Sequence, residues 1–212
     1  MPDSADLLAL FAHPDDAELL AGGTLIKAVD QGHRVVAADL TRGELGSKGT
    51  PEIRAQEAAA AADVMGLAAR HNLGLPDGHL AATDAMRRVV VEAIRRFRPR
   101  VVITHYTVGR HPAHRLTAEL VRDACFLSGL ANYPADGAKH RPVKLLHVMS
   151  YREDAVDPRF GVDTTAQIDR KIRAGYGEAF WSLETVAVDD VVAMGVDSLK
   201  GRGPASPCPN SR

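Results

Sequence analysis

One imidazole and two adjacent carboxylates follow the first apolar run of this 212-residue chain. The run at residues 7–10 leads directly into His13, Asp15 and Asp16. An apolar run of this kind predicts a β-strand, and open α/β sheets build their binding sites at the carboxyl ends of their strands. These three side chains therefore predict one half of a metal site.

A second group of polar side chains follows a later strand-like run. Residues 101–104 are apolar up to the final threonine, and His111 and His114 come shortly afterwards. Two histidines and one carboxylate, with positions left for water, form the ligand set of a hydrolytic zinc centre. His13 and Asp16 lie three residues apart, as do His111 and His114, so each pair can face one point at the start of a helix. The spacing alone does not decide which of the two later histidines binds the metal.

The two adjacent carboxylates allow two interpretations. Asp15 points in a different direction from Asp16, which leaves it free to act as a general base. Alternatively, one of them caps the following helix and the histidines are ordinary loop residues. We prefer the metal site, because both polar motifs follow a predicted strand.

These motifs resemble those of the LmbE-like (PIG-L) metal-dependent amino-sugar deacetylases. The first motif of that family, Ala-His-Pro-Asp-Asp, is matched by residues 12–16, and its second, His-Pro-Asp-His, is matched at residues 111–114 except at Ala113. The closest resemblance is to the deacetylases of N-acetylglucosaminyl-malate in bacillithiol synthesis, and it extends from about residue 6 to about residue 151. This narrower match is carried by residues 39–46, 49–54, 72–78 and 110–112.

The resemblance implies roles for the residues of both motifs. His13, Asp16 and His114 would bind the metal, and the family, not the spacing, selects His114 over His111. Asp15 would accept the proton of the attacking water, and protonated His111 would assist the oxyanion and protonate the departing amine. An alternative for His111 is a hydrogen bond to a neighbouring group without a catalytic role. Zinc (Zn²⁺) is the expected metal, although Fe²⁺, Co²⁺ or Mn²⁺ would also fit.

The expected substrate follows from charged side chains that the resemblance places near it. These are Arg42, Glu44, Arg54 and Arg110. Malate carries two carboxylates, and a chain with a net charge of −1 must bind them through local cations, for which the arginine fork is well suited. Arg54 could instead lie on a solvated helix face, and Glu44 could pair with Arg42. We expect release of acetate from N-acetylglucosaminyl-malate, with another N-acetyl amino sugar as the alternative substrate.

Two departures from the family pattern leave a second alternative open. Ala113 replaces an aspartate that would orient His111 and raise its pKa. In addition, residues 162–172 resemble a late helix of the family and residues 176–180 its final segment, but a stretch normally found between them is absent. Tyr176 could assist the oxyanion or be an ordinary tyrosine. A metal-binding family member with little catalysis is therefore the competing hypothesis.

Composition predicts one domain, residues 1–200, followed by a disordered tail at residues 201–212 that is rich in Gly, Pro and Ser. The interspersed charges argue against nucleic-acid binding, and the absence of a long apolar segment argues against membrane insertion. Cys125 and Cys208 do not suggest a disulfide framework. We therefore expect a cytoplasmic protein, and the resemblance implies a homo-oligomer, often a hexamer.

Predicted strands and helices alternate along the chain, which indicates a Rossmann-like α/β fold with a mostly parallel sheet. The strands are expected at residues 6–12, 34–40, 70–73, 101–104 and 143–150, and the helices at residues 17–31, 51–65, 84–97 and 114–127. Thr50 and Thr83 are the expected caps of the second and third helices. A dinucleotide-binding site is disfavoured, because the first turn lacks glycines and Gly22 and Gly23 fall inside the first helix.

Overall fold

The computed structural model describes residues 4–149 and 158–174, and all structural statements below concern these residues. Five parallel strands form one sheet in the order β3-β2-β1-β4-β5. The strands are β1 (Leu7–Phe11), β2 (Val35–Thr41), β3 (Ala69–Leu75), β4 (Val101–Thr104) and β5 (Lys144–His147). The helices are α1 (Asp16–Asp30), α2 (Pro51–Met65), α3 (Asp84–Phe97), α4 (Pro112–Leu127) and α5 (Ile168–Ala174), with a short 3₁₀ turn, η1 (Thr165–Gln167), before α5.

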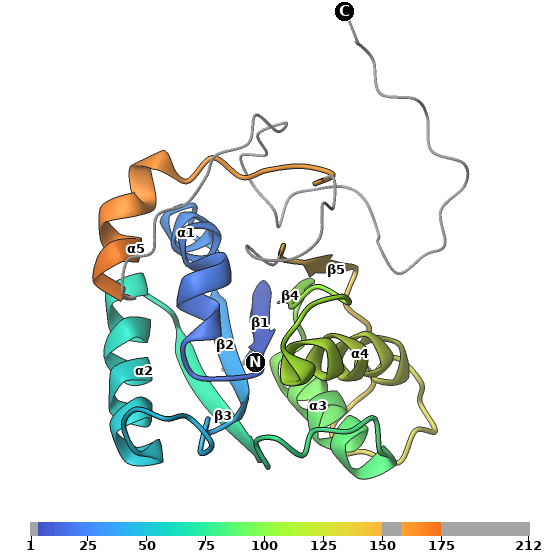
Figure 1. Ribbon diagram of the computed structural model, residues 1–212. Coiled ribbons are helices and arrows are strands. Elements are labelled where there is room, and N and C mark those ends of the chain that lie inside the picture. The colour runs from blue at the N-terminus through green and yellow to red at the C-terminus, as the bar shows by residue number, and fades with distance from the viewer. Residues whose placement is uncertain (1–3, 150–157, 175–212) are drawn as a thin grey trace, which may run out of the picture.

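The sheet is covered by helices on both faces. Figure 1 shows α1, α2 and α5 on one side and α3 and α4 on the other. Every residue of the central strands β1, β2 and β4 is buried, as expected for parallel strands that lie between two helical layers. Within β1, Leu8 and Leu10 join the apolar cluster under α3 and α4, whereas Leu7, Ala9 and Phe11 join the cluster under α1. The prediction of a Rossmann-like α/β fold is confirmed.

Local sequence signals set several helix ends. The side-chain oxygens of Thr50 and Thr83 accept the backbone N–H groups of Ile53 and Met86, each at 3.3 Å, so both predicted caps are confirmed. Helix α4 begins at Pro112, two residues earlier than predicted, because proline is well suited to a first helical position. His111 consequently becomes the N-cap residue of α4.

Other boundaries differ from the sequence prediction. Strand β3 continues to Leu75, and β5 is limited to Lys144–His147. The late helix begins only at Ile168, after η1, and not at residue 162. Tyr176, Cys208 and the tail at residues 201–212 lie outside the described residues, so those predictions are not tested.

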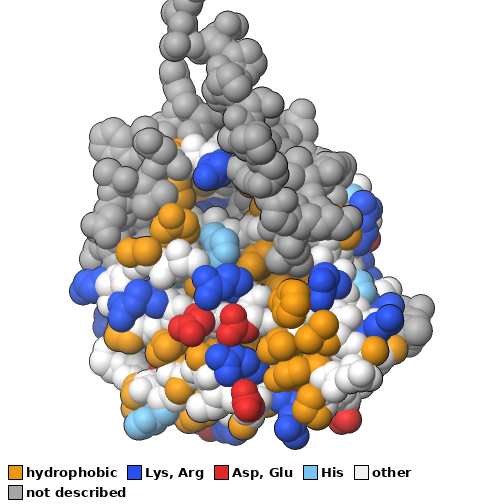
Figure 2. Space-filling model, turned by 90° about the vertical axis from the view of Figure 1, so that its right-hand side faces the viewer, with side chains coloured by type: hydrophobic (Ala, Val, Ile, Leu, Met, Phe, Trp, Pro, Cys, Tyr) orange, Lys and Arg blue, Asp and Glu red, His pale blue; other side chains and the backbone are white. Residues whose placement is uncertain are grey.

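Charges of both signs lie next to one another on the face that Figure 2 presents, which agrees with the interspersed charges of the sequence. Within the described residues, none of the helices combines the length and the apolar character that a bilayer-spanning segment needs.

Candidate metal centre and active site

The polar motifs meet at the carboxyl ends of three strands. His13 and Asp16 follow β1, His105 follows β4, and Asp77 follows β3. The chain leaves β1 for β2 on one side and later returns to β4 on the other, so the carboxyl ends of β1 and β4 form the topological switch point of the sheet. The fold therefore places these side chains where α/β proteins usually bind ligands.

The carboxylate of Asp16 lies between two histidines. Its Oδ1 is 3.2 Å from Nε2 of His114, and its Oδ2 is 3.2 Å from Nδ1 of His13. Oδ2 also accepts the backbone N–H of His13 at 2.8 Å, which fixes the carboxylate in the turn between β1 and α1. Asp16 thus lies next to both of the other predicted ligands, His13 and His114.

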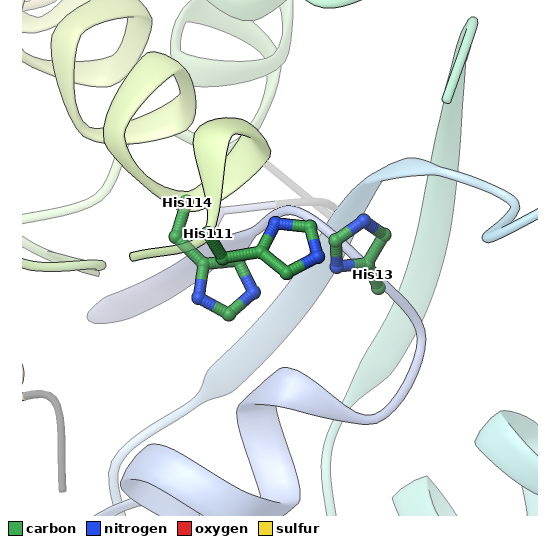
Figure 3. Close-up of side chains that lie close together, drawn as sticks. All are labelled: His13, His111 and His114. Atoms are coloured by element: carbon green, nitrogen blue, oxygen red, sulfur yellow. The ribbon is translucent and has the colours of Figure 1, made fainter. Parts of the chain in front are cut away.

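His111 joins this group from the N-cap of α4. Its ring is stacked on that of His114 with centroids 4.4 Å apart, and its centroid lies 5.0 Å from that of His13. Figure 3 shows His111 and His114 pointing from the start of α4 toward His13. In the part of the chain that the structure describes, two overlapping groups have ligand atoms within 4.8 Å of one another: His13, His111 and His114, and Asp16, His105 and His114.

Two residues of this site were not predicted. His105 is buried, its Nε2 lies 3.3 Å from Oδ2 of Asp16, and its ring is stacked on His114 at 4.0 Å. Asp77 is also buried, and its Oδ1 lies 3.2 Å from Nε2 of His13. The position of each residue just after a strand was the available signal in the sequence.

Asp15 occupies the N-cap position of α1, but its side chain makes no capping hydrogen bond. The capping alternative is therefore wrong for Asp15, and Asp16 lies inside the helix and faces the histidines. The carboxylate of Asp15 is more than half exposed, and its Oδ2 accepts a hydrogen bond from Nη2 of Arg54 at 3.2 Å. It is thus available to a substrate beside the histidine cluster.

A pocket of about 500 Å³ lies over the site. Its polar side chains are His13, Asp15, Asp16, Arg54, Asp77, His111 and His114, and leucines 19, 45, 80 and 116 form much of its apolar wall. Of the predicted substrate-binding residues, Arg54 therefore faces this pocket and does not lie on a solvated helix face.

The other three predicted substrate-binding residues do not line the pocket. Arg42, Glu44 and Arg110 are exposed, and Oε1 of Glu44 accepts the backbone N–H of Asp77 at 2.8 Å. Glu44 therefore supports the loop that carries Asp77. A direct role of these three residues in substrate binding stays a prediction.

The electrostatics of the site fit a divalent cation. Burial opposes the charge on Asp16, but the favourable interactions with the imidazoles of His105, His114 and His13 outweigh it and hold the pKa of this carboxyl well below its usual value. Burial lowers the pKa of His105. An ionised carboxylate among imidazoles is a donor set that zinc and similar ions favour.

His111 is a weaker base than the typical family motif would suggest. Burial, together with the neighbouring His114 and His13, lowers its pKa. Ala113 is buried in the apolar cluster under α3 and α4 and offers no carboxylate to counter this effect. The cationic form of His111 is consequently disfavoured near neutral pH.

An arginine with a buried side chain holds the turn that carries the predicted ligands. Arg70, on β3, donates from Nε and Nη2 to the two carboxylate oxygens of Asp39 at 2.9 and 3.0 Å. It also forms an ion pair with Glu18 and donates from Nη2 to the backbone oxygen of Pro14 at 2.8 Å. Because Pro14 lies between His13 and Asp15, this network ties the metal-site turn to the sheet.

We expect Arg70→Met to lower the free energy of unfolding by about 3 kcal/mol, because it leaves two buried carboxylates without their cation. Urea unfolding of the metal-free protein measures this change. Arg88→Met, at an exposed position of α3, is the matched control and should change stability by less than about 0.5 kcal/mol. Equal effects of the two substitutions would show that the buried network does not stabilise the turn.

Comparison with known proteins agrees with this fold. The sequence profile of the PIG-L family, described as GlcNAc-PI de-N-acetylase, matches residues 8–125, which include all the residues of the site discussed above. The chain belongs to this family. The conserved protein TT1542 from Thermus thermophilus is similar in structure, with a TM-score of 0.77 and 43% sequence identity, over 80% of this chain and 77% of that chain.

Two relatives have more specific names. A diacetylchitobiose deacetylase of Thermococcus kodakarensis is 31% identical over 142 residues, which cover 62% of this chain and 53% of that protein. A probable N-acetyl-alpha-D-glucosaminyl L-malate deacetylase 2 of Bacillus anthracis is 28% identical over 137 residues, 58% of this chain and 61% of that protein. The chain thus spans about half to three-fifths of the length of these relatives.

Proposed function

We propose that this protein is a metal-dependent hydrolase that removes the N-acetyl group from an N-acetylglucosamine conjugate. The observation that carries the proposal is the Asp16 carboxylate, held 3.2 Å from both His13 and His114 beneath a pocket that also contains the exposed carboxylate of Asp15. Membership of the PIG-L family supports the same reaction class.

In this proposal His13, Asp16 and His114 hold one divalent cation, which we take to be zinc, with Fe²⁺, Co²⁺ and Mn²⁺ as alternatives. Such an ion, when bound, lowers the pKa of water and polarises the acetamide carbonyl. Asp15 accepts the proton of the attacking water, and Arg54 holds the Asp15 carboxylate in place through their 3.2 Å contact. Water and the amide are thereby converted to acetate and a free amine.

His111 is the candidate donor of the proton that the departing nitrogen needs. It lines the same pocket, and its stacking on His114 fixes its ring beside the predicted ligands. Because burial lowers the pKa of His111 and Ala113 does not offset this, we expect protonation of the amine to be slower than in a protein with aspartate at this position. The site nevertheless contains a candidate for each of these roles. We therefore prefer a catalytic protein over a family member that only binds metal.

For the substrate we propose N-acetylglucosaminyl-malate, the molecule in the name of the Bacillus anthracis relative. The supporting feature is Arg54, a cation in the pocket that can bind a carboxylate. Diacetylchitobiose, an uncharged amino sugar named in the other relative, is the alternative. A homo-oligomeric state, with a hexamer as the expected form, and a cytoplasmic location are further proposals that rest on the sequence.

Acetate release from these two substrates tests the proposal. We expect a higher kcat/KM for the malate conjugate, and we expect Arg54→Gln to reduce the ratio of the two values at least about tenfold, because one charge-assisted hydrogen bond is lost. The ratio cancels any general effect of Arg54 on Asp15. Release from diacetylchitobiose alone would assign the other substrate, and metal binding without any release would establish the non-catalytic alternative.

A further inference from the structure

Each ring nitrogen of His13 lies next to a carboxylate. Nδ1 lies 3.2 Å from Oδ2 of Asp16, and Nε2 lies 3.2 Å from Oδ1 of Asp77. A neutral imidazole has only one N–H, and its other nitrogen offers a lone pair. The nitrogen that keeps the proton therefore decides on which side His13 can bind a metal ion.

Asp77 is held in place as an acceptor. The backbone N–H of Gly78 donates to its Oδ1 at 2.8 Å and that of Leu45 to its Oδ2 at 3.2 Å. Its own backbone N–H donates to Glu44 at 2.8 Å, and the side chain is buried. A carboxylate that already receives two backbone N–H groups can only accept from a third neighbour, so the group opposite it must donate.

We propose that Asp77 is a positioning residue that fixes the tautomer of His13. Asp77 accepts the Nε2 proton and thereby directs the Nδ1 lone pair toward Asp16, where the proposed metal ion binds. Carboxylates that accept the second N–H of a metal-bound histidine commonly fix its tautomer and ring orientation in this way. This role rests on the metal site of the proposed function.

His105 also lies next to Asp16, but its hydrogen bonds differ from those of His13. Its Nε2 is only 3.3 Å from Asp16, but the backbone N–H of Ala12 donates to this nitrogen at 3.0 Å. The lone pair of Nε2 is therefore already engaged by the backbone at the end of β1. Hydrogen-bond partners thus distinguish the two histidines, since one presents a lone pair toward Asp16 and the other does not.

Asp77→Asn tests this role with almost no change in shape. The amide can present an N–H group to Nε2 of His13, which would move the ring proton to Nδ1, on the side of Asp16. We expect the affinity for Zn²⁺, measured by competition with a chelator, to fall about 10-fold to 100-fold. Asp63→Asn, at an exposed position of α2, is the control and should keep the wild-type affinity.

A second measurement does not require metal or activity. Nitrogen-15 NMR of the metal-free protein, at a pH at which the ring is neutral, should show the His13 proton on Nε2 in the wild type and a shift toward Nδ1 in Asp77→Asn. A wild-type proton on Nδ1, or unchanged Zn²⁺ affinity in a folded Asp77→Asn, would overturn the proposal.

The outcomes separate this role from the proposed function. Zn²⁺ binding that depends on Asp77, in a wild-type protein that releases no acetate, would support the positioning role and contradict the deacetylase. Acetate release with an unchanged tautomer and affinity in Asp77→Asn would support the deacetylase alone. If Asp77→Asn does not fold, the position of the His13 ring proton in the wild type still tests the positioning role.

Discussion

Asp16→Asn should abolish both zinc binding and acetate release. Asp16 supplies the negative charge among the predicted ligands, and its two oxygens approach His13 and His114 at 3.2 Å. The amide keeps the shape but removes the charge, and its NH₂ group would face a nitrogen that must offer a lone pair. Since a catalytic metal contributes several kcal/mol to the transition state, its loss corresponds to a rate at least about a thousandfold lower.

Metal content and acetate release are measured on the same purified sample. Treatment of the wild type with a chelator should reproduce the loss of activity, and separate additions of Zn²⁺, Fe²⁺, Co²⁺ and Mn²⁺ should identify the ions that restore it. Asp63→Asn is again the matched control, because its carboxylate is exposed on α2. A full equivalent of tightly bound zinc in Asp16→Asn would place the metal elsewhere.

The parts of this site that depend on local sequence could be predicted. The threonine caps at Thr50 and Thr83 act within one helical turn, so their effect can be read from neighbouring residues. The meeting of His13 and Asp16 with the later histidine pair required only that each motif follow a strand and that parallel strands end at the same edge of the sheet. The choice of His114 over His111 as the predicted ligand came from the family resemblance.

The hydrogen-bond partners of these ligands could not be predicted in the same way. Asp77 reaches His13 from the end of β3, a strand separated from β1 by β2. Its contact depends on the path of the loop after β3 and on the backbone donors of Leu45 and Gly78. His105 became important only because Ala12 and Asp16 converge on one of its nitrogens.

The direction of long side chains was the other unpredictable feature. Arg54 enters the pocket because the neighbouring loop leaves space for it, and a Cβ atom at Gly46 would overlap its guanidinium. Arg42 and Arg110 have similar chemistry and also lie near the motifs in the sequence, yet they are exposed and do not line the pocket. Loop geometry, and not residue type, separates these arginines.

Asp15→Asn should lower kcat for acetate release about a thousandfold while the zinc content stays at the wild-type value. The amide keeps the size of the carboxylate but cannot accept the proton of the attacking water, and positioned general bases typically contribute factors of about 100 to 10,000. Asp15 does not contact His13 or His114 in the hydrogen bonds and ion pairs described above, so its replacement should leave the predicted ligands in place. Unchanged zinc content separates this outcome from that of Asp16→Asn.

The pocket itself limits the possible interpretations of this experiment. Its carboxylates, among the residues that the structure describes, are Asp15, Asp16 and Asp77. Asp16 is held between the histidines, and Asp77 already accepts hydrogen bonds from two backbone groups and faces His13. Of these three, Asp15 alone has an exposed carboxylate that a water molecule and a substrate can approach together. A loss of kcat of less than about tenfold in Asp15→Asn would be smaller than the contribution of a general base. The proton of the attacking water would then have to leave by a route without a carboxylate. In that case the proposed mechanism would be wrong even if the metal site were correct.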